Sequence, residues 1–121
     1  MDFSQSDLLD HFENTSQAEF DRLDFGVIKL DSSGNVLEYN IYESRATGLS
    51  RDRVVGRHFF SEIGGCMNNP QIAGRFERDS SLDIEFDYIF ALRMQIEPVR
   101  LRLLKSVHAT AMYLLVKRSN R

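Results

Sequence analysis

The sequence is poor in cysteine, tryptophan and proline, and it contains no long apolar segment. Its 121 residues include one cysteine, two prolines and no tryptophan. A single cysteine excludes an internal disulfide framework and a cysteine-based zinc site, and it suits a reducing compartment. No apolar run approaches the ~18 residues of a membrane span, and the acidic, polar N-terminus is unlike a secretory signal. We therefore expect one cytoplasmic globular domain with no membrane partner.

Basic residues are almost absent from the first 24 positions. This segment holds seven acidic residues and one arginine, a net charge of −6, which leaves +3 for the rest of the chain. The two parts could attract each other or attract separate partners, or they could be two solvated faces without a function. The later basic residues are not interleaved with a stacking platform of exposed aromatic residues. We therefore expect no binding of nucleic acid.

The acidic N-terminal segment predicts two short helices. Leu8, Leu9 and Phe12 form an apolar stripe, and the run from Ser16 to Glu19 is a capping box ahead of further apolar residues. Helices this short are marginal alone and need another surface to pack on. We interpret residues 1–24 as an N-terminal helical cap and residues 25–121 as the core, together forming one domain.

The core alternates between strand patterns and helical pieces. Strands are predicted at 25–30, 36–41, 82–92, 99–103 and 112–116, and Leu37, Tyr39 and Ile41 are expected to share one face. Short helical pieces occupy 42–64, and a longer helix is predicted with Asn69 as N-cap and Pro70 at its first position. This order predicts an α+β fold, a five-stranded antiparallel sheet with helices packed over it and the N-terminal helical cap.

Cys66 is the first candidate for chemistry. It follows two glycines and precedes the predicted helix start, which favours negative charge. A stabilised thiolate would make Cys66 a nucleophile toward an activated acyl group. The alternative, which spacing alone favours, is a small buried hydrophobe, the usual state of a free cysteine.

Tyr39 and Glu43 are the second candidate, four residues apart where a strand gives way to a helical turn. Together in an apolar pocket, a phenol and a carboxyl group could both donate hydrogen bonds to a buried anion, because burial keeps a carboxyl group protonated. The alternative is that Asn40 caps the helix and Glu43 completes a solvent-exposed capping box. Spacing alone favours this alternative.

The sequence contains none of the common catalytic arrangements. It has no Gly-rich phosphate loop, no paired-carboxylate motif and no serine–histidine arrangement, and His11, His58 and His108 are scattered. We therefore expect no enzymatic activity.

Several segments together resemble the photoactive yellow protein family, whose members are PAS-fold light sensors. The resemblance spans about residues 25–118 and rests on Phe25 to Asp31, Gly34 to Asn40, Glu43, Thr47-Gly48, Val55-Gly56-Arg57, Phe59-Phe60, Cys66, Gly74-Arg75-Phe76, Phe86-Asp87-Tyr88 and Val116-Lys117-Arg118. Its most specific part is the set of tyrosine, glutamate, threonine and cysteine in register with the flanking glycines.

The resemblance implies a blue-light photoreceptor with p-coumaric acid attached to Cys66 as a thioester. It implies that Tyr39 and Glu43 bind the phenolate oxygen and that Thr47 bonds Tyr39 from behind. Light would isomerise the double bond, and Glu43 would give its proton to the phenolate. The resulting buried carboxylate would open the N-terminal cap and signal to a downstream protein.

The resemblance also suggests residues for the pocket wall, and the chain departs from the family pattern at several positions. Phe59, Phe90 and Met94 are expected to form the wall or to assist the return isomerisation. Family members commonly have arginine where this chain has Leu49, tyrosine at Leu92 and proline at Gly65. The stretch from 66 to 86 is also about three residues short. These differences affect colour, recovery and the pocket lid, and they leave the attachment chemistry intact.

Two other functions fit the same residues. One is a PAS module that binds a different small molecule or none, and the other is a PAS interaction domain that signals by dimerising. A flavin photosensor is not favoured, because the residues around Cys66 lack the polar and arginine side chains expected there. We expect a monomer or a weak dimer.

Overall fold

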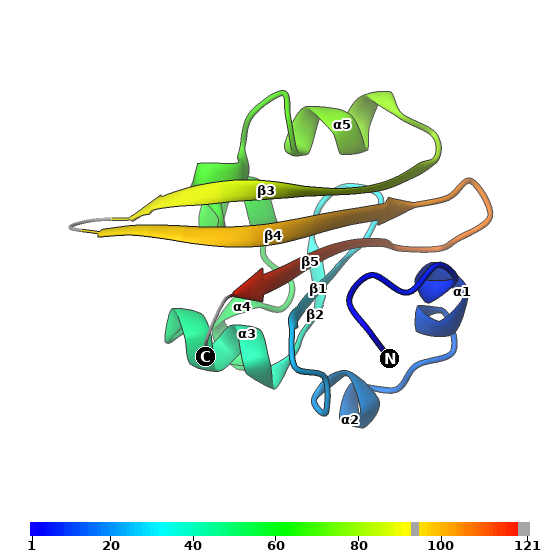
Figure 1. Ribbon diagram of the computed structural model, residues 1–121, viewed down its shortest axis with the longest axis horizontal. Coiled ribbons are helices and arrows are strands. Elements are labelled where there is room, and N and C mark those ends of the chain that lie inside the picture. The colour runs from blue at the N-terminus through cyan, green and yellow to red at the C-terminus, as the bar shows by residue number, and fades with distance from the viewer. Residues whose placement is uncertain (93–94, 119–121) are drawn as a thin grey trace.

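Five strands form one antiparallel sheet in the computed structural model, which describes residues 1–92 and 95–118 (Figure 1). The strands are β1 (Gly26–Leu30), β2 (Val36–Tyr39), β3 (Leu82–Leu92), β4 (Gln95–Lys105) and β5 (Met112–Arg118). Their spatial order is β2-β1-β5-β4-β3, so the last strand of the chain lies at the centre. The predicted α+β class and five-stranded antiparallel sheet are confirmed.

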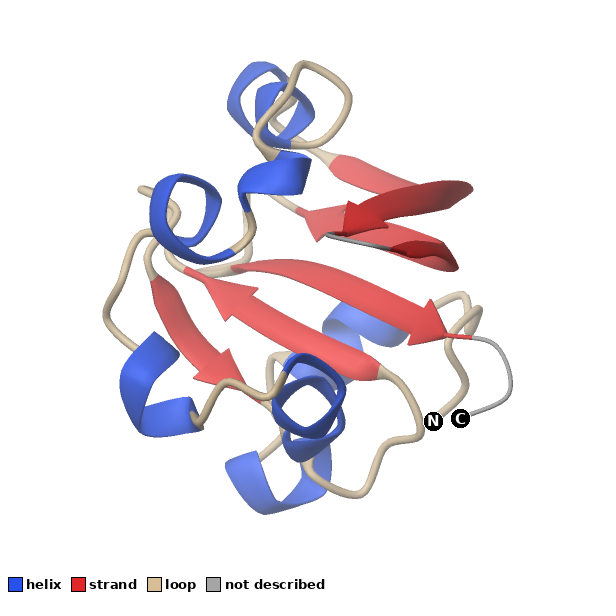
Figure 2. Ribbon diagram, turned by 90° about the vertical axis from the view of Figure 1, so that its left-hand side faces the viewer, coloured by secondary structure: helices blue, strands red, loops and turns tan. Residues whose placement is uncertain are grey.

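The helices cover both faces of this sheet (Figure 2). The segments between β2 and β3 cover one face and comprise α3 (Ile41–Thr47), α4 (Arg51–Val54), the π-helical turn η1 (Phe59–Ile63), the 3₁₀ turn η2 (Gly65–Met67) and α5 (Ala73–Arg78). The N-terminal segment covers the other face with α1 (Leu8–Phe12) and α2 (Gln17–Phe20). No helix within the described ranges is long and apolar enough to cross a membrane.

The continuous apolar run of β5 follows from this double cover. Leu114 and Val116 belong to the core beneath the segments that join β2 to β3, whereas Tyr113 and Leu115 belong to the core beneath the N-terminal segment. Successive side chains of a strand point to opposite faces, so a strand covered on both sides needs apolar residues at every position. The sheet therefore separates two cores, one on each face.

The predicted strand 36–41 is too long by two residues. β2 ends at Tyr39, and Ile41 begins α3 because the Asn40 side chain caps this helix by accepting from the backbone N–H of Glu43. The predicted common face is therefore wrong, since Tyr39 is buried while Leu37 and Ile41 are exposed. The helix cap made by the buried Asn40 ends the strand before the apolar alternation does.

The predicted helix start at Pro70 is also wrong. Residues 70–72 form a turn, and α5 begins at Ala73. Asn69 does accept the backbone N–H of Ile72 through Oδ1 at 3.0 Å, but its amide group donates to the Tyr88 hydroxyl at 2.9 Å. The asparagine thus ties the turn to β3, and the helix starts three positions later than the sequence predicts.

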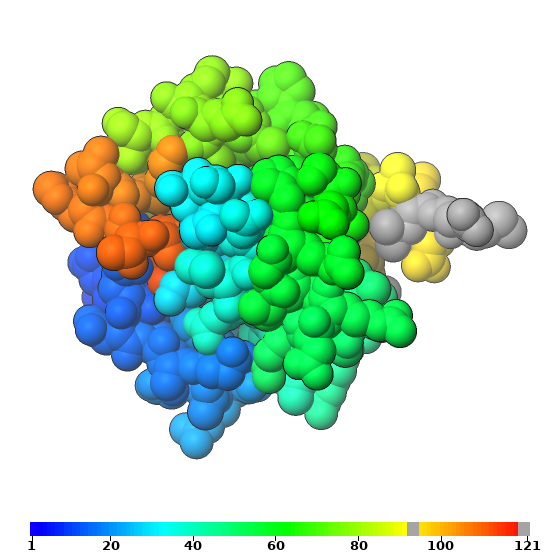
Figure 3. Space-filling model, turned by 180° about the vertical axis from the view of Figure 1, so that it is seen from behind, coloured from blue at the N-terminus to red at the C-terminus, as the bar shows by residue number. Residues whose placement is uncertain are grey.

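β3 and β4 form a long hairpin whose far half supplies one wall of the site described below. The two strands pair from Leu82 with Lys105 to Leu92 with Gln95, and the end of β3 projects from the body of the molecule (Figure 3). Phe90 of β3 pairs with Glu97 of β4, and both residues face the segments that connect β2 to β3.

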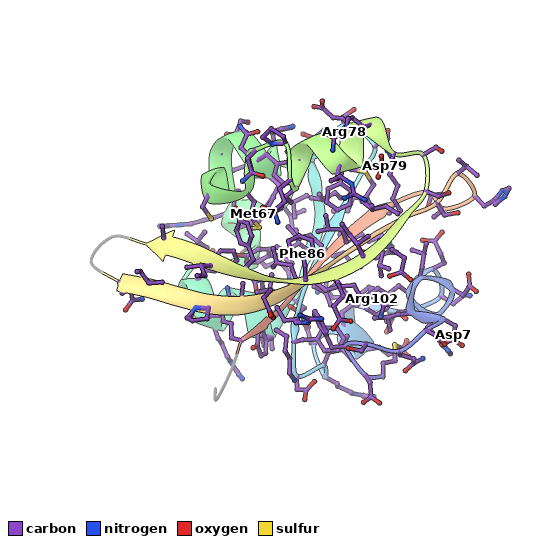
Figure 4. All side chains as sticks on the ribbon, turned by 45° about the horizontal axis from the view of Figure 1, so that its top comes forward. Asp7, Met67, Arg78, Asp79, Phe86 and Arg102 are labelled. Carbon is purple, nitrogen blue, oxygen red and sulfur yellow. The ribbon has the colours of Figure 1, made fainter. Side chains whose placement is uncertain are left out.

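Polar contacts fasten the N-terminal segment to the sheet. Arg102 of β4 lies on the side of the sheet that this segment covers (Figure 4), and its Nη1 donates to the carbonyl oxygens of Phe3 at 2.8 Å and Gln5 at 2.7 Å. Lys117 of β5 pairs with Asp24 at 3.0 Å. The acidic segment and the basic strands thus attract each other in part, which is one of the alternatives that the charge pattern left open.

Candidate functional site

A cavity of about 370 Å³ brings together most of the residues that the sequence predicts for the site. Its lining includes Tyr39, Glu43, Thr47, Leu49, Phe59, Gly64, Cys66, Met67, Phe90, Gln95, Glu97 and Arg118. This volume lies within the range of small-molecule sites, about 300 to 1,000 Å³. Met94, the remaining predicted residue, lies outside the described residues.

Cys66 lies in η2 with an exposed thiol that also borders the cavity. Its carbonyl oxygen accepts hydrogen bonds from the Tyr88 hydroxyl at 2.9 Å and from Nδ2 of Asn69 at 3.3 Å. The alternative that Cys66 is a buried hydrophobe is therefore wrong. Tyr88 holds the cysteine in place from β3, a contact that the sequence analysis did not identify.

The predicted activation of Cys66 by a helix start is also wrong. α5 begins only at Ala73, and η2 is too short to present an effective positive end. Partial burial instead raises the pKa of the Cys66 thiol above its ordinary value. The thiol can be reached, but attack on an acyl group needs a good leaving group on the donor.

Tyr39 is buried at the end of β2 and is bound through Thr47. Its hydroxyl lies 2.9 Å from Oγ1 of Thr47, which donates in turn to the carbonyl oxygen of Glu43 at 2.9 Å. Because the Thr47 proton is used on that carbonyl, Tyr39 donates to Thr47 in this arrangement. Burial and then the nearby Glu43 carboxylate raise the pKa of Tyr39 to about 12, so this phenol is neutral at physiological pH.

Because of this raised pKa, we expect Tyr39 to lower the free energy of unfolding at alkaline pH. The folded protein holds the phenol proton more tightly than the unfolded chain, whose phenol has a pKa near 10, so the free energy of unfolding falls as pH rises from about 10 to 12. The slope expected from one such group is about 1.4 kcal/mol per pH unit. Urea unfolding at several alkaline pH values checks this, because Tyr39→Phe should have a shallower decline. Parallel declines in the two proteins would contradict it.

Glu43 points inward and pairs with the last described residue of β5. Its side chain is 4% exposed, and its two carboxylate oxygens accept from Nη1 and Nη2 of Arg118 at 2.6 and 3.2 Å. Asn40 does cap α3, but the predicted alternative of a solvent-exposed carboxylate is wrong. Burial raises the pKa of Glu43, and the guanidinium of Arg118 opposes that shift.

The sequence analysis did not identify the role of Arg118. The period-two alternation of β5 places Arg118 on the cavity face with Leu114 and Val116, which is the only local signal for its position. Its pairing with Glu43 joins residues 75 positions apart, and no local pattern predicts such a contact.

Gly26 of β1 leaves the space that the Glu43 carboxylate occupies. A Cβ atom at Gly26 would lie 2.1 Å from Oε1 and 2.9 Å from Cδ of Glu43. The cavity is also close-packed at Gly64, since a Cβ atom there would lie 2.5 Å from Cζ of the buried Phe59. These two glycines are therefore needed for the shape of the site rather than for an unusual backbone conformation.

The cavity has the chemistry of an organic-ligand site rather than a metal site. Within residues 1–92 and 95–118, no cluster of three or more histidine, cysteine, aspartate and glutamate side chains could hold a metal ion. The lining instead combines aromatic and aliphatic side chains with a phenol, a carboxylate, a guanidinium and a thiol. Such a lining, mostly apolar with a few polar groups, suits a small organic molecule.

The strand order, the helical segments over one face and the cavity between them and the sheet define a PAS domain. The PAS domain of an HTR-like protein from Haloarcula marismortui has the same fold, with a TM-score of 0.63 and 15% identity over 94% of this chain and 99% of that one. Family models give no match.

Closer relatives define the family. The photoactive yellow protein of Rhodothalassium salexigens is 32% identical over 119 residues, which cover 96% of this chain and 95% of that protein. The photoactive yellow protein domain of the sensor histidine kinase Ppr from Rhodospirillum centenum has a TM-score of 0.81 and 34% identity, covering 91% of this chain and 99% of that domain. The chain belongs to the photoactive yellow protein family.

Proposed function

We propose that this protein is a blue-light photoreceptor that carries p-coumaric acid as a thioester on Cys66. The observation that carries the proposal is a single cavity lined by both a solvent-accessible thiol and the buried pair of Tyr39 and Glu43. The relatives that define the family are photoactive yellow proteins and a domain of a sensor histidine kinase, which supports a sensory role. When bound, the pigment supplies a double bond that blue light isomerises.

The residues present suit this group. Phe59 and Phe90 are buried aromatic walls for a flat ring, and Thr47 already binds the hydroxyl of Tyr39. Tyr39 can donate to an anion in the cavity if its proton turns away from Thr47, whose hydroxyl then donates to Tyr39 in place of the Glu43 carbonyl. Charge-assisted hydrogen bonds of this kind are stronger than neutral ones and offset the burial of an anion.

In this proposal Glu43, protonated because burial raises its pKa, is the proton donor of the pocket, and the N-terminal segment is the part that opens. Residues 1–24 are joined to the sheet through side chains on its far face, so they can detach without breaking the sheet itself. The relative from Rhodospirillum centenum is a domain of a sensor histidine kinase. We propose a downstream signalling protein as the partner of this chain too.

Covalent uptake of the pigment tests the attachment. The purified chain is incubated with an activated ester of p-coumaric acid and analysed by intact-protein mass spectrometry, beside Cys66→Ala. The expected result is one added coumaroyl group on the wild type and none on the variant. Equal labelling of both proteins, or labelling of neither, would contradict attachment at Cys66.

A further inference from the structure

Arg118 is held in one place by contacts on several sides. Its guanidinium, 4% exposed, binds both carboxylate oxygens of Glu43, and its Nε donates to Oε1 of Glu97 at 3.3 Å. The guanidinium lies 5.8 Å from the ring centroid of Phe90, and the backbone N–H of Arg118 donates to the Tyr42 hydroxyl at 3.0 Å. Removing one contact therefore leaves the cation in position.

Arg118 also separates two spaces. Together with Glu97 it lines both the cavity and an outer cleft of about 570 Å³, whereas Glu43 lines the cavity alone. The outer cleft also contains the acidic residues Asp21 and Asp24. The guanidinium thus stands between the Glu43 carboxylate and this outer cleft, whose lining also includes the basic residue Arg45.

The charges around Glu43 favour one partner. Among the residues that the structure describes, the titratable groups facing it are the neutral phenol of Tyr39 from β2, Glu97 from β4 and Arg118 from β5, and Gly26 of β1 lies against it. An arginine keeps its proton at all physiological pH values. The Arg118 cation, in direct contact with Glu43, therefore neutralises a negative charge that develops on Glu43.

We propose that Arg118 is a fixed counter-ion of Glu43, which neutralises the carboxylate when Glu43 is ionised and binds Glu97 alone when Glu43 is protonated. For the light response the inference rests on the proposed function, and it limits that response. The buried carboxylate that would open the N-terminal segment is compensated here, so a smaller opening follows. The counter-ion role itself is independent of the pigment.

Infrared spectroscopy of the pigment-free protein tests the counter-ion role. The carbonyl stretch of a protonated carboxylic acid is followed against pH and assigned to Glu43 by its loss in Glu43→Gln. An opposite charge this close changes the proton affinity of a carboxylate by about tenfold or more. Arg118→Met should therefore raise the pKa of Glu43 by at least about one unit, and Arg118→Lys should restore most of the difference. An unchanged titration in folded Arg118→Met would overturn the proposal.

A second variant covers the case in which Arg118→Met does not fold. Arg118→Gln keeps hydrogen-bond donors in place of the guanidinium but removes its charge. The proposal predicts that the pKa of Glu43 rises in this variant too. A fall or no change would overturn it.

The light-dependent part is tested in the pigment-loaded protein by amide hydrogen exchange of residues 1–24, in the dark and under blue light. The increase on illumination should be larger in Arg118→Met than in the wild type, and equal increases would overturn this part. A protein that takes up no pigment would instead contradict the proposed function. The infrared titration would still decide the counter-ion role in that case.

Discussion

Replacing Gly26 with alanine should destabilise the protein by about 3 to 5 kcal/mol, the usual consequence of breaking a buried ion pair from one side. The new Cβ atom would lie 2.1 Å from Oε1 and 2.9 Å from Cδ of Glu43, closer than real Cβ atoms lie to other heavy atoms, so the carboxylate or the strand must shift. Either shift separates Glu43 from Arg118, which then loses its bidentate partner. The measurement is urea unfolding at neutral pH.

Gly65→Ala is the matched control for this substitution. A Cβ atom at Gly65 meets nothing within 4 Å, so the same chemical change should have little effect on the free energy of unfolding. A double-mutant cycle with Glu43→Ala adds a stricter test, because Gly26→Ala should be nearly neutral once the carboxylate is gone. Equal stability of Gly26→Ala and Gly65→Ala would show that the space beside Glu43 is not limiting.

Arg102→Met should loosen the N-terminal segment and lower the free energy of unfolding by about 2 to 3 kcal/mol. The Arg102 side chain is 4% exposed, and besides the carbonyl oxygens of Phe3 and Gln5 it binds both carboxylate oxygens of Asp83 at 2.9 and 3.0 Å. Methionine preserves most of the apolar stem but none of these hydrogen bonds. Amide hydrogen exchange of the first residues should become faster, in addition to the loss of global stability.

Arg100→Met is the control on the same strand face. Arg100 is 43% exposed, and it binds Glu85 and Asp87 of β3 rather than the N-terminal segment. Surface ion pairs contribute little, so this variant should change neither the stability nor the exchange of the first residues appreciably. If both variants behaved alike, Arg102 would not be a specific link between the sheet and the segment.

Local sequence patterns predicted several elements of the fold. Alternation of apolar and polar residues identified β3, a continuous apolar run identified β5, and the capping box at Ser16 and Glu19 is present with both of its hydrogen bonds. These features depend on neighbours in the sequence, so the sequence alone suffices to predict them.

The errors arose where a side chain bonds far along the chain. Asn40 caps α3, but it also accepts from the backbone N–H of Val27 and donates to the carbonyl oxygen of Phe25, which fixes the end of β2. Asn69 is tied to Tyr88 of β3, and the start of α5 moves accordingly. Neither contact can be predicted from the local sequence pattern, because its partners lie far apart in the chain.

In the site, too, some residues could be predicted from the sequence and some contacts could not. The resemblance named Cys66, Tyr39, Glu43 and Thr47, and the structure places all four around one cavity. The partner of Glu43 could not be predicted, because the two residues meet only after β5 enters the centre of the sheet beside β1. The sequence shows that position 49 is leucine rather than arginine. It does not show that Arg118, at the end of β5, lines the cavity.

The most direct test of the photoreceptor proposal is the absorption spectrum of the chain after reaction with activated p-coumaric acid, recorded before and after blue light. Cys66→Ala treated in the same way is the control. The proposal predicts a visible band in the wild type only, which blue light bleaches and darkness restores. A band that light leaves unchanged, or the absence of any band, would contradict it.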